Sequence, residues 1–293
     1  MVANERGQLL LVGGIAVAIV VFSTILFAHS LAVTDGITTT GSADTIERTA
    51  DREASVERDL GQLAAQARVD GLDGFEERYE YALRNYTRTH NRVVASSGGT
   101  YLNATLNESA SLGTEVNQTQ TPAEKFKKPS GGGGNKWLLV NESTRIAVFN
   151  LTYVKLNGGG NPTTIVIENT TDRWTMTLDG TPSGPHKEIF VNGVSRCSGS
   201  ANIDVDLLAG TCEISGTTKT YPTFTDKLGG GYNITIKHGS QSHVTYLFAA
   251  DGDFSDIDSD HKSSYPVVPA VDTTYDTSSA SYNRTVLVEV NDG

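Results

Sequence analysis

The sequence is poor in cysteine and in basic residues, and each shortage excludes a class of protein. Only 2 of its 293 residues are cysteine, so a scaffold built on several disulfides is excluded. Its 23 lysines and arginines are outnumbered by 34 aspartates and glutamates, which gives a formal net charge of -11. Nucleic-acid-binding proteins need basic surfaces that meet phosphate groups, so this class is disfavoured. The acidic, threonine-rich composition is typical of a solvated surface, or of one adapted to high salt.

Long apolar runs are also scarce, because only residues 9–33 form a run long enough to be a membrane span. As a helix this run would measure roughly 37 Å, more than the ~30 Å hydrocarbon core of a bilayer. Arg6 is the only basic residue near either end, and the positive-inside rule therefore favours a cytoplasmic N-terminus. The sequence predicts a single-pass membrane protein with a cytoplasmic leader at 1–7, a transmembrane helix at 8–33 and its bulk outside the cell.

Three fates of the apolar run remain open. It is an uncleaved signal anchor, a secretory signal cut after Ala28-His29-Ser30, or a prepilin-type signal cut between Gly7 and Gln8, which retains the run. A secretory signal is disfavoured because its apolar region usually has about 7 to 15 residues and follows a positively charged segment. The first and third alternatives both keep the run in the mature chain.

The two cysteines, Cys197 and Cys212, have a spacing that suits a disulfide closing a hairpin or a long loop. Closing a loop of about 15 residues contributes about 3 kcal/mol to stability by the chain-entropy argument. The alternative is a metal pair, but no histidine or further cysteine lies nearby in the sequence, and a zinc site normally needs four ligands. We therefore predict the disulfide.

Several Asn-x-Ser/Thr triplets match the acceptor pattern for N-linked glycans. They begin at Asn85, Asn103, Asn107, Asn117, Asn141, Asn150, Asn169, Asn233 and Asn283. Such triplets arise by chance in a threonine-rich chain, and all of these fall on the predicted exterior side. The sequence predicts a glycoprotein but does not indicate which of the asparagines carry a glycan.

Residues 43–95 have the periodicity of an amphipathic helix or a helix pair. Apolar residues recur at spacings near three and four from Ile46 to Val93, and charged residues fill the opposite face. Gly71 and Gly74 weaken the middle of the segment, where it can divide in two. Its apolar stripe must be buried, either on the chain's own domain or against neighbouring subunits.

The remaining residues divide into a linker and a β-rich region. Residues 96–135 are rich in glycine, serine and threonine, which predicts a flexible linker. Over residues 136–293, apolar and polar residues alternate in short runs separated by glycine, asparagine, aspartate and proline, which predicts an antiparallel, sandwich-like exterior domain. The predicted fold class is therefore α+β, with an N-terminal transmembrane helix, a long amphipathic helical segment and then this β-rich domain.

No catalytic motif is present: the sequence contains no Gly-x-Ser-x-Gly, phosphate loop or His-Glu-x-x-His. We therefore expect no enzyme, no catalytic residue and no cofactor. The best candidate for a metal site is an acidic run whose alternate carboxylates could converge on a calcium ion. These residues are Asp251, Asp253, Asp256, Asp258 and Asp260. Their spacing differs from that of a helix–loop–helix calcium loop, so an acidic, solvated loop is the alternative.

The N-terminus resembles the class III signal of archaeal type IV pilin-like proteins. The resemblance rests on Arg6-Gly7-Gln8 followed by Leu9-Leu10-Leu11, and it covers only this end of the chain. The composition is similar to that of haloarchaeal single-span surface proteins. The resemblance implies cleavage after Gly7 by a prepilin-type peptidase and assembly with like or related pilin subunits. The chain departs from the pattern at the fifth mature position, where many pilins have glutamate and this sequence has Val12.

The functional prediction is a pilin-like cell-surface subunit, either a minor pilin or a pilus-associated protein. The alternative is a monomeric, membrane-anchored surface glycoprotein with an adhesive or cell-envelope role and no filament. The expected partners are the membrane and, for the first function, related pilin subunits and the peptidase. Nucleic acid is not an expected partner.

Overall fold

A computed structural model describes residues 43–94, 101–129, 135–157, 160–226, 228, 231–276 and 281–288. The chain divides into two compact units, Met1–Ala54 and Ser55–Gly293. Of the first unit only residues 43–54 are described, as the beginning of a helix. The contacts discussed below all lie within the second unit.

The described part of the chain is mainly antiparallel β-sheet with two helices. The predicted fold class, α+β with an N-terminal transmembrane helix and a long amphipathic helical segment, is therefore wrong. The helices are α2 (Ala43–Arg68) and α3 (Phe75–Val94). Between them Gly71 and Gly74 adopt φ angles of 88° and 67°, a left-handed conformation that favours glycine and ends the helix. The Arg78 side chain closes this turn by donating hydrogen bonds to the carbonyl oxygens of Ala67 and Asp73 at 2.8 and 2.7 Å.

The predicted transmembrane helix at 8–33 lies outside the described residues. None of the helices in the described ranges combines the length and the apolar character needed to cross a membrane. Within the described ranges the structure therefore contradicts the prediction of a single-pass membrane protein with a cytoplasmic N-terminus and an extracellular bulk.

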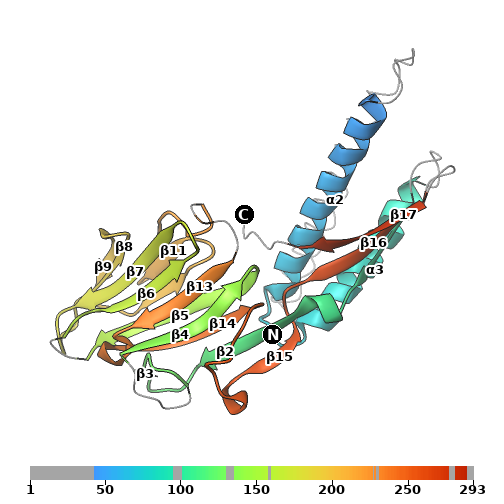
Figure 1. Cartoon of the computed structure of the whole chain (residues 1–293). Coiled ribbons are helices and arrows are strands. Elements are labelled where there is room, and N and C mark those ends of the chain that lie inside the picture. The colour runs from blue at the N-terminus through green and yellow to red at the C-terminus, as the bar shows by residue number, and fades with distance from the viewer. Residues whose placement is uncertain are drawn as a thin grey trace, which may run out of the picture. The chain divides into compact units, whose positions relative to one another are not determined.

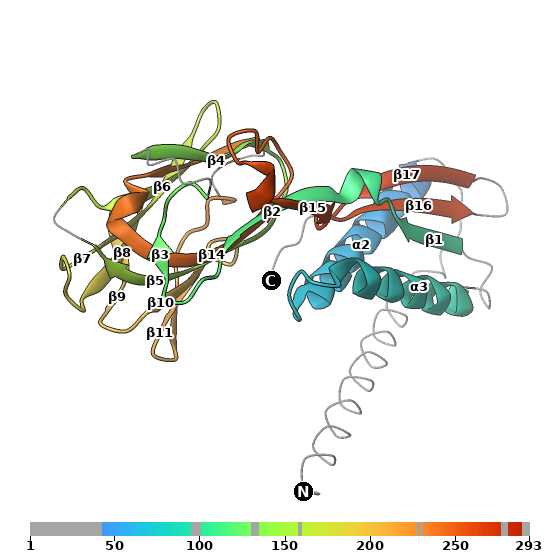
Figure 2. The same cartoon turned by 90° about the horizontal axis from the view of Figure 1, so that it is seen from below.

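Helices α2 and α3 cover one face of a three-stranded antiparallel sheet in the order β1-β16-β17 (Figures 1 and 2). The strands are β1 (Tyr101–Leu106), β16 (Ala270–Asp276) and β17 (Ser281–Leu287). The helices bury Val56, Leu60, Ala64, Ala67, Phe75, Tyr79 and Leu83 against Leu102, Ala104, Val271, Tyr275, Val286 and Val288. The amphipathic stripe of this region is therefore buried on the chain's own sheet.

The predicted linker is wrong for much of its length, because residues 101–125 contain three strands. Besides β1 they are β2 (Leu112–Gln118) and β3 (Glu124–Lys125), with the 3-10 turn η1 (Ser109–Ser111) between β1 and β2. In β1 the buried Leu102 and Ala104 alternate with the exposed Tyr101 and Asn103. Because the residues that alternate with Leu102 and Ala104 are mostly polar, the segment has the composition of a linker.

The larger body is a sandwich of two antiparallel sheets that share one apolar core (Figure 1). One sheet has the order β12-β11-β10-β5-β14-β2-β15, with β3 also paired to β14, and the other has the order β4-β13-β6-β7-β8-β9. The additional strands of the first sheet are β5 (Ile146–Leu156), β10 (Ile203–Asp206), β11 (Thr211–Ile214), β12 (Thr217–Thr220), β14 (Ser242–Ala250) and β15 (Ser263–Pro266). Those of the second are β4 (Lys136–Ser143), β6 (Thr163–Glu168), β7 (Arg173–Gly180), β8 (Lys187–Val191), β9 (Val194–Gly199) and β13 (Tyr232–Lys237). The 3-10 turns η2 (Gly239–Gln241) and η3 (Ser259–His261) lie in connections.

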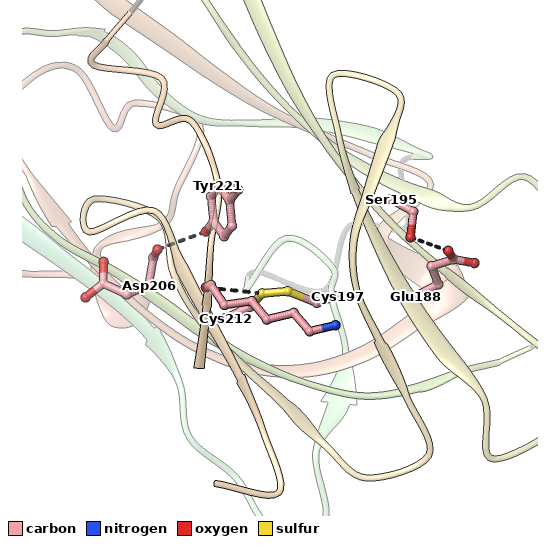
Figure 3. Close-up of a disulfide and its surroundings, with 7 residues drawn as sticks. Glu188, Ser195, Cys197, Asp206, Cys212 and Tyr221 are labelled. Carbon is pink, nitrogen blue, oxygen red and sulfur yellow. Dashed lines mark hydrogen bonds between the residues drawn. A yellow bond between two sulfur atoms is a disulfide. The ribbon is translucent and has the colours of Figure 1, made fainter. Parts of the chain in front are cut away.

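The predicted disulfide between Cys197 and Cys212 is confirmed, and it links the two sheets of the sandwich rather than a hairpin (Figure 3). Cys197 lies on β9 and Cys212 on β11, with their Cα atoms 6.6 Å apart and both side chains fully buried. Beside it the Tyr221 hydroxyl donates a 2.9 Å hydrogen bond to the backbone oxygen of Asp206. The disulfide therefore fixes the outer strands of the two sheets to each other.

We expect the double variant Cys197→Ala/Cys212→Ala to have a free energy of unfolding about 3 kcal/mol lower than the wild type, because the unfolded chain loses a closed loop. Urea unfolding at neutral pH measures this difference. Reduction of the wild type should give the same loss, and reductant should leave the double variant unchanged. Coincident urea transitions of the variant and the oxidised wild type would show that the disulfide does not stabilise the sandwich.

Candidate functional site

The outer face of the larger sheet carries an open polar groove of about 520 Å³. Its floor is formed by strands β5, β10, β11 and β14, and Thr119 and Thr121 of the β2–β3 connection border it. The lining also includes Asn150, Thr152, Asp204, Asp206, Thr211, Glu213, Thr218, Thr245 and Leu247. Three of these residues are acidic, and the lining contains no lysine, arginine or histidine.

The strand register arranges these side chains in two rows that run across the sheet. The first row is Thr218, Glu213, Asp204, Thr152 and Thr245, and the second is Thr211, Asp206, Asn150 and Leu247. Side chains alternate between the two faces of a strand, so Val205 and Leu151, which lie between the rows, are buried in the sandwich core. The groove is therefore the solvent face of strands whose opposite face builds the core.

Hydrogen bonds within the groove hold its acceptor groups in place. The Thr152 hydroxyl donates to Asp204 at 2.6 Å, and Asp206 accepts the backbone N–H groups of Leu208 and Ala209 at 2.9 Å each. In the orientation that satisfies both of its polar atoms, the Asn150 amide donates to Asp206 at 3.3 Å. Carboxylates held in a lining that has no basic residue suit a ligand that offers hydrogen-bond donors and repel an anionic one. The lining residues include no cysteine or histidine.

This groove is not predicted from the sequence, although part of its pattern is visible there. Asp204-Val205-Asp206 is a short alternation of polar and apolar residues, and it correctly indicates a strand with one polar face. Which strands lie beside it depends on pairing between distant segments, such as β10 with β5. The two rows therefore become visible only in the folded sheet.

The structure does not gather the predicted calcium ligands into one site. Among the described residues no group of three or more His, Cys, Asp or Glu side chains is placed to hold a metal ion. Asp253 accepts from the backbone N–H and hydroxyl of Ser255 at 2.8 and 3.0 Å, and Asp260 accepts from Ser259 at 3.3 Å. Asp256 and Asp258 are exposed. The run has the features of the acidic, solvated loop that was the alternative prediction.

Asp251, the first residue of that run, has a structural role. Its carboxylate accepts hydrogen bonds from the backbone N–H groups of Thr144 and Arg145 at 2.7 and 2.8 Å and from the Thr144 hydroxyl at 2.6 Å. It also forms an ion pair with the Arg145 guanidinium at 3.2 Å. Burial alone would raise the pKa of Asp251, but these hydrogen bonds and the guanidinium together hold its pKa below the ordinary 3.8.

The sequon asparagines fall into two groups by exposure. The exposed ones are Asn103, Asn117, Asn150 and Asn283, and the partly buried ones are Asn85, Asn107, Asn141, Asn169 and Asn233. The predicted processing residues Arg6, Gly7 and Gln8 lie outside the described part of the chain.

No protein-family model matches this chain, and no significantly similar curated protein was found.

We expect Asp251→Asn to lower the free energy of unfolding by roughly 1–3 kcal/mol at neutral pH, because Arg145 loses its partly buried counter-charge. Because the native pKa lies below the unfolded one, the stabilisation is complete above about pH 4 and is lost as the pH falls through the native pKa. Urea unfolding at a series of pH values measures both effects.

The exposed Asp260→Asn is the matched control and should change stability by less than about 0.5 kcal/mol. A gap between the wild type and Asp251→Asn that does not narrow as the pH falls below about 4 would contradict the assigned role of the carboxylate charge.

Proposed function

We propose that this protein is a pilin-like surface subunit that assembles with like or related subunits after a short leader is removed. The observation that carries the proposal is the order Arg6-Gly7-Gln8 directly before the apolar run of residues 9–33. Cleavage between Gly7 and Gln8 would place this run at the new N-terminus, where it is available for contact between subunits. Val12 stands where many pilins have glutamate, so we assign the chain as a minor or pilus-associated subunit rather than the main component of a filament.

Two features of the described structure support the proposal. The Cys197–Cys212 disulfide is fully buried in the sandwich, and such bonds persist in oxidising environments outside the cytosol. The polar groove is lined by hydrogen-bond acceptor groups that are held in place, as in a contact surface. A β-rich body that displays such a face is suited to contact other molecules.

The assignment predicts that the protein isolated from the cells that produce it begins at Gln8. Mass spectrometry of the N-terminal peptide measures this directly. Gly7→Val should block cleavage because the peptidase acts next to this small residue, and the chain should then retain residues 1–7. Gly13→Val, inside the apolar run, is the matched control and should leave the cut unchanged. A wild-type chain that retains its leader, or begins after Ser30, would refute the proposal.

The groove favours adhesion as a second candidate function. Asp204 and Glu213 face each other on β10 and β11 and would both accept hydrogen bonds from a donor-rich partner. We expect Asp204→Asn/Glu213→Gln to weaken binding of the purified protein to cell surfaces at least about tenfold, since hydrogen bonds to charged groups contribute about 1.5–3 kcal/mol each.

The matched control for this experiment is Asp256→Asn/Asp260→Asn, which removes the same charge from an exposed loop away from the groove. Equal binding by the two double variants would show that the groove is not the contact surface.

A further inference from the structure

Two sequons occupy matching positions on the two edges of the three-stranded sheet. Strand β16 is in the middle, so β1 and β17 are both edge strands. Asn103 of β1 and Asn283 of β17 are both paired in register with Thr274 of β16. The hydroxyl residues that complete the sequons, Thr105 and Thr285, are in turn both paired with Asp272. The two acceptor triplets are thus arranged symmetrically about the central strand.

Both asparagines lie on the face of this sheet that the helices leave open. The neighbours Leu102 and Ala104 of β1 and Val286 of β17 are buried against α2 and α3, so alternation directs Asn103 and Asn283 to solvent. Figure 2 shows the helices on one side of β1, β16 and β17. The two asparagines therefore present their amides on one common surface.

Within the described ranges the side-chain amides of these two residues form no hydrogen bond, unlike those of the other exposed sequons. Asn117 donates to Glu115 at 2.6 Å, and the Asn150 amide donates to Phe149 and Asp206 within the groove. No hydrogen bond of the Asn103 or Asn283 side chain occurs within the described ranges. Exposure and a free amide nitrogen together single out this pair.

We propose that Asn103 and Asn283 carry N-linked glycans and that the glycans shield the two edge strands of this sheet. The donor is an oligosaccharide joined through phosphate to a lipid carrier. The asparagine Nδ2 forms a bond to C1 of the first sugar and loses one proton, while the bond from C1 to the phosphate oxygen breaks and the lipid phosphate leaves. No oxidant or reductant is required.

The physical reason for shielding is that an edge strand presents N–H and C=O groups that can pair with another chain. On β1 the Asn91 side chain already bonds the N–H and C=O of Leu102, at 2.9 and 2.8 Å, so shielding concerns the rest of that strand. The exposed apolar side chains of Tyr101 on β1 and Leu287 on β17 add to this liability. A glycan is bulky and solvated, so one on each edge strand hinders approach from both sides. Both edge strands would then be hindered from pairing with another chain, while the groove on the sandwich stays open.

The inference rests on the export that the proposed function requires, and one sample can test the two separately. Full-length protein is isolated from the cells that produce it, and its peptides are analysed by mass spectrometry. We expect a glycan mass on Asn103 and on Asn283 and none on Asn107, whose amide donates to both carboxylate oxygens of Asp272. Unmodified Asn103 and Asn283 in a chain that begins at Gln8 would overturn this inference alone, whereas glycans on a chain that begins at Met1 would overturn the proposed function alone.

Variants separate the sequon from the side chain itself. Asn103→Gln, Asn283→Gln and Thr105→Val should each lose one glycan mass, while Thr105→Ser keeps the acceptor pattern and should keep the glycan. Asn107→Gln is the matched control and should keep both glycans.

Removal of both glycans tests the shielding role. Asn103→Gln/Asn283→Gln should elute as a dimer or larger species at a concentration where the wild type and Asn107→Gln both elute with a smaller protein mass. Size exclusion with light scattering measures these masses. An unchanged mass of the double variant would overturn the shielding role.

Discussion

The ion pair between Arg145 and Asp251 holds together segments that lie far apart in the sequence. The guanidinium donates to Asp251 at 3.2 Å and also to the carbonyl oxygens of Ala110 and Val268 at 2.9 and 3.0 Å. It therefore binds the β4–β5 hairpin, the end of β14, the η1 turn and the β15–β16 connection with a single side chain. Arg68 of α2 adds a second such link, because it donates to the carbonyl oxygens of Ala147 and Val267 at 3.2 and 2.7 Å. Each backbone oxygen used in this way would otherwise need water at a crowded crossing point.

The sandwich depends on the same contacts, because strands β2 and β15 of its larger sheet lie directly beside the segments that Arg145 links. Ser111, fully buried in η1, donates to the backbone oxygen of Ala270 at 3.2 Å and accepts the backbone N–H of the same residue at 2.8 Å. At the opposite end of the sandwich the disulfide joins β9 to β11. Polar contacts at one end and a covalent bond at the other frame one apolar core.

Local patterns in the sequence predicted the parts of this structure that depend on nearby residues. Alternation found the strands after Lys136, and Gly71 and Gly74 marked the point where the helical region divides. Strand β1 is not predicted by local patterns, because Leu102 and Ala104 become a core face only when α2, α3 and β16 cover and pair with them. The structural role of Asp251 is not predicted either, because its partners Thr144 and Arg145 are more than a hundred positions away. The groove and the paired sequons likewise depend on register between distant strands, which no local window contains.

The pairing of β1 with β16 has a consequence for the order in which the chain can fold. Asn107, just after β1, and Asp272 in β16 are 165 positions apart, and β17 follows later still. During synthesis the apolar faces of α2 and α3 therefore have no sheet to cover until nearly the whole chain has emerged, although the sandwich strands from β4 to β14 are already available to pair. Contacts closed over such long loops form slowly, so the helices spend the interval with Leu60, Phe75 and Leu83 uncovered. A factor that holds this stripe during synthesis would be displaced when β16 and β17 pair with β1 and cover the helices.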